Sequence, residues 1–92
     1  MSYQRIDLSK TFIKQLKKAP IEIRLQFRKR FELFLNNPHT LSLRNHSLKG
    51  KHIGLRSINI TGDWRALYSE RMEKDKMIVI FELLGTHSQL YK

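Results

Sequence analysis

The order of hydrophobic patterns along this chain predicts an α+β fold with the element order β-α-α-β-β-β. Apolar residues recur at helical spacing as far as Asn36, and from Ile53 onward they follow the period of β-strands. Short turns join the three strands of the second half, which predicts an antiparallel meander. Because such a sheet needs one face covered, we expect an antiparallel sheet with two N-terminal helices packed on one face.

The elements of the N-terminal half have clear signals at their ends. Residues Tyr3–Leu8 form a short predicted strand, and Ser9 is a good helix N-cap because its hydroxyl can accept from free amides of the first turn. Pro20 suits the first turn of a second helix, where its missing amide costs nothing. Asn36-Asn37-Pro38 ends that helix. The second helix carries a stripe of predicted core residues, Phe27, Phe31 and Phe34.

The second half predicts a loop followed by the meander. Residues 39–52 are polar and carry no strand or helix pattern. Strands are predicted at Ile53–Ile60, Trp64–Ser69 and Met77–Leu84, with turn residues at 61–63 and a charged turn at 73–76. Because no repeat or linker interrupts the chain, we expect residues 1–92 to form a single domain.

The charge is the strongest global feature. Eighteen Lys and Arg against eight Asp and Glu give a formal net charge of +10. This predicts a polyanionic partner, with nucleic acid first, an acidic protein second and an anionic membrane surface third. The chain has no Cys, which fits the reducing cytoplasm, where we expect it. No apolar run approaches the ~20 residues needed to cross a bilayer, so we expect no membrane insertion.

The chemistry suggested by the residues themselves is proton transfer beside a phosphate. His87 follows a Gly-Thr turn at the end of the last predicted strand, in a strongly basic chain. Histidine can give or take a proton near neutrality because its ordinary pKa is ~6.5. The alternative is a surface histidine near the chain terminus. The four histidines lack the spacing or the Cys partners of a metal site, so we expect neither a metal nor another cofactor.

Four segments, taken in order and spacing, resemble the RelE/ParE toxin superfamily and its YafQ-like branch. They are Asn45–Gly50, Leu55-Arg56, Asp63–Tyr68 and Gly85–Tyr91. The resemblance implies a RelE-like toxin of a type II toxin–antitoxin system, which enters the ribosomal A site and cuts mRNA there. It also implies an acidic antitoxin as partner, with a heterotetramer as one assembly of the pair. The implied cleavage is metal-free, with 2′-hydroxyl attack on the adjacent phosphate to give a 2′,3′-cyclic phosphate and a 5′-hydroxyl.

The resemblance also implies roles for individual residues. His87 matches the general acid, and Asp63 matches a candidate base or orienting carboxylate. His46 matches the histidine of the loop motif, and Arg65 matches an arginine that holds the scissile phosphate. Tyr91 stands where an aromatic ring would stack on a base or on its neighbour. Such chemistry needs a base, an acid and cations for the charge that builds on the phosphorane.

Four further residues are predicted to contact RNA or phosphate, and two positions depart from the YafQ-like pattern. The predicted RNA contacts are Lys49, Lys51, Arg56 and Asn59. YafQ-like proteins carry a second sheet histidine where this chain has Asn59, and an acidic residue where it has Ser57. An amide can donate a hydrogen bond but cannot transfer a proton near neutrality. The departures therefore predict weaker cleavage, cleavage that relies on His46 and His87 alone, or lost activity.

Alternatives remain open at the level of function and of single residues. A ParE-like toxin acts on DNA gyrase without cutting RNA, and a catalytically silent RelE-fold module only binds. Asp63 can instead satisfy backbone amides in its turn. Arg65 can instead pair with Glu82 or Glu70 across the sheet. His52 is interpreted as an ordinary loop residue.

Overall fold

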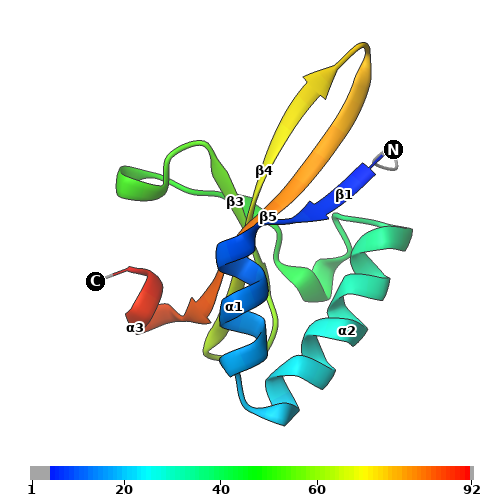
Figure 1. Ribbon diagram of the computed structural model, residues 1–92. Helices are drawn as coiled ribbons and strands as arrows, with labels where there is room; N and C mark the ends of the chain where they lie inside the picture. The colour runs from blue at the N-terminus through cyan, green and yellow to red at the C-terminus, as the bar shows by residue number, and fades with distance from the viewer. Residues whose placement is uncertain (1–4, 92) are drawn as a thin grey trace.

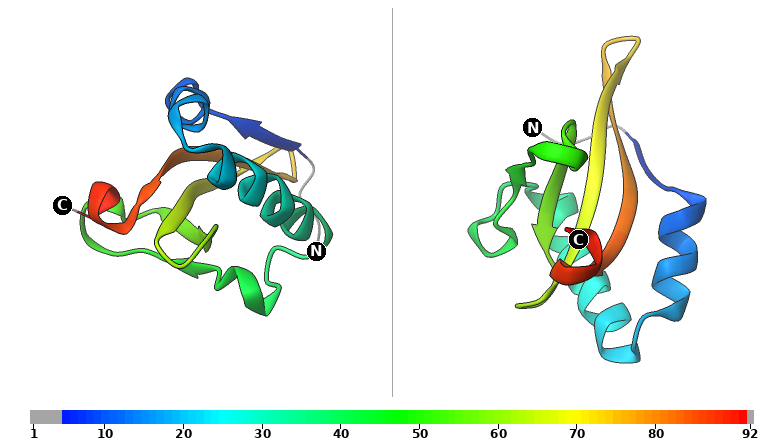
Figure 2. Two further views of the ribbon diagram at one scale, coloured as in Figure 1. Left: turned by 90° about the horizontal axis from the view of Figure 1, so that it is seen from below. Right: turned by 90° about the vertical axis from the view of Figure 1, so that its left-hand side faces the viewer.

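The computed structural model describes residues 5–91 and consists of a five-stranded sheet with two helices on one face (Figures 1 and 2). The strands are β1 (Arg5–Leu8), β2 (His46–Ser47), β3 (Leu55–Asn59), β4 (Trp64–Glu73) and β5 (Lys76–Thr86). The helices are α1 (Lys10–Lys18), α2 (Ile21–Asn36) and α3 (His87–Leu90), with 3-10 turns η1 (Leu41–Leu43) and η2 (Gly50–His52). The predicted α+β class is confirmed. Tyr3, in the predicted first strand, lies outside the described residues.

The sheet has the strand order β1-β5-β4-β3-β2. The pairs β2–β3, β3–β4 and β4–β5 are antiparallel, as the meander predicts. The structure differs from a wholly antiparallel sheet at one edge, where β1 runs parallel to β5. β1 fills the edge that the meander leaves open. Its end is held there by Ser9, whose backbone amide donates to the Phe81 carbonyl at 2.9 Å before the chain turns into α1.

The two long helices begin and end close to the predicted positions. The Ser9 hydroxyl accepts from the Phe12 amide at 3.0 Å and caps α1 as predicted. Pro20 is the N-cap of α2, one residue before its first turn. α2 ends at Asn36, and Asn37 leaves it in an extended conformation.

Three features of the structure were not predicted from the sequence. The hairpin of β4 and β5 reaches further than predicted and turns at Lys74-Asp75, both with positive φ, 49° and 66°. Such a two-residue turn suits the twist of a hairpin, so the strands continue up to it. β2 forms inside the predicted loop, and α3 forms after β5. The Thr86 hydroxyl and the Gln89 side chain cap α3 reciprocally.

The core is an aromatic cluster between β5 and the helices, centred on Phe81. Its ring lies with centroid separations of 5.3–5.9 Å from five other rings, which come from α1, α2 and β4. These rings are Phe12, Phe27, Phe31, Phe34 and Tyr68. Tilted and edge-to-face pairs at such distances add to the free energy gained from burial. The predicted phenylalanine stripe of α2 therefore packs on the sheet.

We predict that Phe81→Ala lowers the free energy of unfolding by about 3–5 kcal/mol, because a fully buried ring is removed from the centre of the core. Urea unfolding followed by the fluorescence of the single tryptophan, Trp64, measures the change. Leu41→Ala is the control, since Leu41 is 92% exposed and should hardly change the midpoint. Equal effects of the two substitutions would contradict the central place of Phe81.

Candidate functional site

The two faces of the sheet differ in what covers them. Ile58 and Ala66 are paired across β3 and β4, and both are fully buried in the cluster that includes the helix residues. Side chains alternate along a strand, so Ser57, Asn59 and Arg65 point to the opposite face. We call this the site face. η2 and α3 both project on its side of the sheet (Figure 2).

Two rows of cross-strand neighbours lie on the site face. The first row is His46, Ser57, Leu67 and Leu83. The second row, one step nearer α3, is Asn59, Arg65 and Gly85. Successive rows on one face are separated by about 7 Å along the strands. The structure therefore brings His46, Asn59 and Arg65 to one face from three strands.

The turn before β4 and the start of α3 meet at the end of the sheet. The His87 backbone amide donates to the Asp63 carbonyl at 2.9 Å. The His87 ring packs on Tyr91, with centroids 4.6 Å apart, and the Tyr91 amide donates to the His87 carbonyl at 2.9 Å. Asp63, His87 and Tyr91 thus lie next to the Asn59–Arg65 row, although they come from distant parts of the sequence.

The structure shows that Asp63 does not satisfy the amides of its turn, which was one of the two alternatives for this residue. The turn amides are satisfied by the Thr61 hydroxyl, which accepts from the amides of Asp63 at 3.3 Å and of Trp64 at 3.1 Å. The Asp63 side chain is exposed and makes no hydrogen bond within residues 5–91. Its carboxylate is therefore open to a substrate or to the neighbouring His87.

Arg65 is held by backbone groups. Its Nη1 donates to the carbonyls of Thr61 at 2.9 Å and Trp64 at 3.1 Å. Glu82, one of its predicted pairing partners, accepts instead from the Ser69 hydroxyl at 2.8 Å. The two carbonyls orient the guanidinium from one side. Its remaining donors suit a phosphate, which arginine can bind in a forked geometry.

His46 has one nitrogen fixed by the backbone. Its Nδ1 lies 2.8 Å from the Arg44 carbonyl, which can only accept a hydrogen bond. The hydrogen is therefore on Nδ1, and Nε2 is the basic nitrogen of the neutral ring. His46 is exposed at the edge strand β2, so Nε2 can reach a bound molecule.

Arg56 is separated from the other predicted site residues. It is the cross-strand neighbour of the buried Tyr68, which places it on the helix-covered face. Its Nε donates to Asn45 Oδ1 at 2.8 Å, and Asn45 Nδ2 in turn donates to the Tyr68 hydroxyl at 2.6 Å. Asn45 therefore links Arg56 to the Tyr68 hydroxyl through its side chain. Its only signal in the sequence is that it opens the first of the matched segments.

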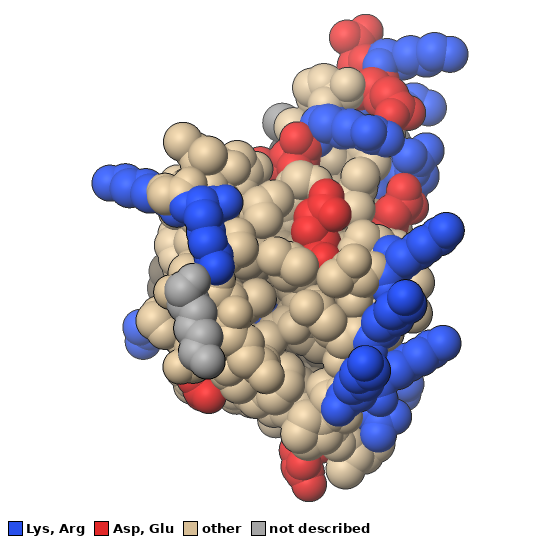
Figure 3. All heavy atoms as spheres, turned by 60° about the vertical axis from the view of Figure 1, so that its left-hand side comes forward, with Lys and Arg blue, Asp and Glu red and all other residues tan. Residues whose placement is uncertain are grey.

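A groove lies beside α3, and its lining includes neither of the predicted site lysines, Lys49 and Lys51. Lys49 and Lys51 are exposed in and beside η2. The groove between α1 and α3 is lined by Gln15, Lys18, Ala19, Trp64, Leu84, Gln89 and Leu90. Figure 3 shows a hollowed, mostly uncharged surface with a row of Lys and Arg side chains along its right margin and a few Lys and Arg side chains on the left. A polyanion crossing this side would pass between cations on both margins.

Two further observations concern metal ions and membranes. Within residues 5–91, no group of three His, Asp or Glu side chains is placed to hold a metal ion. No helix among the same residues is long and apolar enough to span a membrane.

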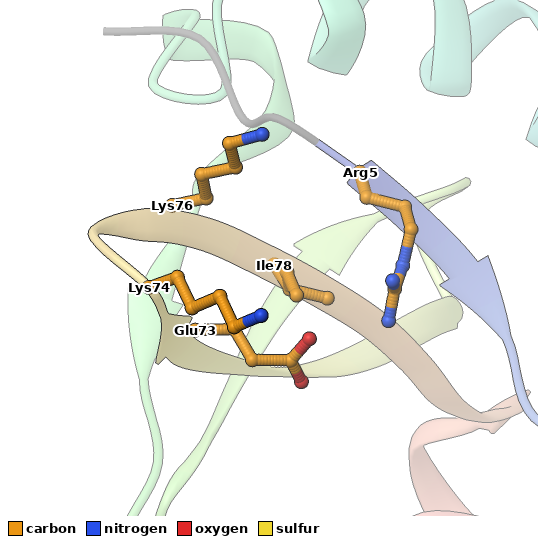
Figure 4. A pocket seen from close by; sticks show the side chains of 5 residues that line it. All are labelled: Arg5, Glu73, Lys74, Lys76 and Ile78. Atoms are coloured by element: carbon orange, nitrogen blue, oxygen red, sulfur yellow. The ribbon is translucent and has the colours of Figure 1, made fainter.

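A second hollow lies at the far end of the sheet. It is lined by Arg5, Glu73, Lys74, Lys76 and Ile78, between β1 and the β4–β5 hairpin (Figure 4). Arg5 pairs with Asp7 and Arg71 pairs with Glu73, each at 3.1 Å and each exposed. β5 starts here and ends beside His87, so this hollow is not part of the candidate site.

Comparison with known proteins finds matches to solved structures but none to family models or curated sequences. No family model matches the chain, and no curated protein matches its sequence. YafQ from E. coli strain BL21(DE3) superposes with a TM-score of 0.76 at 28% identity, over 97% of this chain and 100% of that chain. A chain of the E. coli DinJ–YafQ toxin–antitoxin complex matches with a TM-score of 0.74 at 26% identity, over the whole of both chains. The archaeal RelE–RelB complex from Pyrococcus horikoshii OT3 shares the fold, with a TM-score of 0.71, 24% identity and coverage of 97% and 99%.

Ser57 lies in the middle of the site face. It is fully buried, and its hydroxyl is without a hydrogen-bond partner in the described part of the chain. We predict that Ser57→Ala leaves the free energy of unfolding unchanged or raises it by about 1 kcal/mol, because it removes an unsatisfied polar group. Ser69→Ala is the matched comparison and should lower it by about 1 kcal/mol, since Ser69 donates to Glu82. Urea unfolding measures both, and a large loss for Ser57→Ala would show that the hydroxyl has a partner.

Proposed function

We propose that this chain, whose fold matches that of YafQ and related RelE-type toxins, cleaves mRNA on the ribosome as the toxin of a type II toxin–antitoxin pair. The observation that supports cleavage most directly is the meeting of Asp63 and His87 beside the Asn59–Arg65 row. This arrangement puts acid–base groups and a cation at one end of the sheet. A toxin that only binds gyrase has no need of them.

In the proposed reaction the RNA supplies its own nucleophile. The 2′-oxygen forms a bond to the adjacent phosphorus while the bond to the 5′-oxygen breaks, which leaves a 2′,3′-cyclic phosphate and a 5′-hydroxyl. Arg65 stabilises the charge that builds on the phosphorane oxygens. His87 donates a proton to the departing 5′-oxygen.

The base that we propose is His46. Its Nε2 is the basic nitrogen of the neutral ring, because Nδ1 is held by the Arg44 carbonyl. A histidine, with an ordinary pKa of ~6.5, suits proton abstraction near neutrality better than an aspartate at ~3.9. His46 therefore takes the proton of the 2′-hydroxyl, and Asp63 orients His87.

The charge of the chain and its neighbours support a protein partner as well. The matching structures include complexes of the toxin YafQ with its antitoxin DinJ. A chain with a net charge of +10 attracts both an acidic antitoxin and ribosomal RNA. We propose that a cognate acidic antitoxin binds this chain and that the ribosome with its mRNA is the target.

Replacing the proposed acid gives the decisive experiment. We predict that brief induction of the parent produces new 5′ ends inside the reading frame of a translated reporter mRNA, and that His87→Ala abolishes them. Primer extension on the reporter measures the cuts. His39→Ala is the control, because His39 is exposed in the turn after α2 and is not one of the predicted site residues.

Each alternative has its own outcome in this experiment. Growth arrest without cuts would point to a ParE-like toxin that targets gyrase. A parent without arrest and without cuts would point to a catalytically silent module.

Asn59 offers a gain-of-function prediction. It is the cross-strand neighbour of Arg65 on the site face, at the position of the second sheet histidine of YafQ-like proteins. We predict that Asn59→His raises the cleavage rate, because a positioned proton-transfer group contributes about a hundredfold or more in favourable cases. Asn59→Ala is the matched variant and should not raise it. Equal rates for the two variants would mean that proton transfer at this position does not limit cleavage.

A further inference from the structure

We propose that His52, on η2, is a positioning residue that holds α3 and thereby keeps His87 over the site face. This inference rests on the proposed function, since it assigns His52 an effect on the cleavage step. The sequence marks His52 only as a polar loop residue between Lys51 and Ile53. The structure connects it to the segment that carries the proposed acid.

The first contact is a hydrogen bond to the backbone of α3. His52 Nε2 lies 2.6 Å from the Leu90 carbonyl, across 38 positions of sequence. Because a carbonyl only accepts, Nε2 must carry the hydrogen. The last four carbonyls of a helix have no partner within it. His52 therefore satisfies one of these carbonyls at the C-terminal end of α3.

The second contact is a chain of rings. The rings of His52 and Tyr91 pack edge to face, with centroids 5.6 Å apart and an interplanar angle of 81°. Tyr91 in turn packs on His87 at 4.6 Å. Tyr91 thus lies between the two histidines, so a shift of its ring changes the support of the His87 ring.

α3 needs such support because it is a single turn of four residues. A helix this short is unstable in isolation. Its start is held by the Thr86–Gln89 capping box and by the bond from His87 to the Asp63 carbonyl. Leu90 is buried, but the carbonyl end reaches the rest of the protein through His52. Loss of this bond should release the end of α3 while its start remains in place.

The loop that carries His52 is itself held in a defined shape. The Leu48 amide donates to the Leu55 carbonyl at 3.0 Å, and the Ile53 amide donates to the Gly50 carbonyl at 3.1 Å. Gly50 has φ of 68° and Gly54 has φ of 93°, values that glycine adopts without strain. η2 is therefore a fixed platform from which His52 reaches α3.

The test uses two substitutions that differ in the hydrogen-bond donor. His52→Gln keeps an N–H donor at about the reach of Nε2, whereas His52→Leu removes it. Cleavage of a model mRNA is measured on purified translating ribosomes with the purified full chain. His52→Leu should lower kcat by about tenfold to a hundredfold and leave KM for ribosomes unchanged, because it misplaces a catalytic group without removing a substrate contact. His52→Gln should recover most of kcat, and the control His39→Leu should behave as the parent.

A second readout does not depend on cleavage. The ring resonances of His87 and Tyr91 in NMR spectra should shift in His52→Leu and stay near their parental positions in His52→Gln. Thermal unfolding of each variant checks that the fold persists, and His52→Ser replaces His52→Leu if the latter does not fold.

The outcomes separate the two proposals. An inactive parent would defeat the proposed function, while the NMR shifts would still decide whether His52 holds α3. Parental kcat and unshifted resonances in His52→Leu would overturn the positioning role. A glutamine variant no better than leucine would show that the donor is not what matters, which would overturn it as well.

Discussion

The packing of Phe81 is the interaction on which the rest of this structure depends. One ring on β5 contacts rings from α1, α2 and β4, so a single side chain joins the helices to the sheet. The neighbouring backbone has the same role, since the Phe81 carbonyl accepts from Ser9 where β1 turns into α1. In a chain of 92 residues the core is small, and much of its aromatic contact is concentrated at one strand.

The position of β5 matters because its C-terminal end leads into the candidate site. Its C-terminal end leads directly into Thr86 and His87, and the core therefore sets where the proposed acid begins. Arg65 stands opposite Gly85 on the neighbouring strand and takes its position from the same sheet. The reacting groups thus rest on strands, while α3 and the β2 edge, which complete the site, are short and rely on individual hydrogen bonds.

Asn45 and Ser57 differ in how many hydrogen-bond partners their side chains have. Asn45 uses its side chain fully, accepting from Arg56 and donating to Tyr68 and to the Pro38 carbonyl. Ser57, one strand step from Arg56, keeps a buried hydroxyl without a partner among the described residues. The resemblance to YafQ-like proteins implies an acidic residue at this position, and a serine there leaves the site face less negative. A less negative surface favours an approaching phosphate, and it also removes one charge that could orient His46.

The helices, the meander and the aromatic core could be predicted from the sequence, because each depends on signals a few residues apart. Ser9 and Asn36-Asn37-Pro38 mark helix ends locally, and the spacing of Phe27 and Phe34 marks the buried face. His87 was predicted from its own sequence context and the other reacting residues from motif resemblance, and all of their roles remain predictions. The parallel pairing of β1, the separation of Arg56 from Ser57 and the link from His52 to Leu90 required the folded structure. Strand pairing and register decide which of two adjacent side chains meets the core, and contacts across 38 positions leave no local pattern in the sequence.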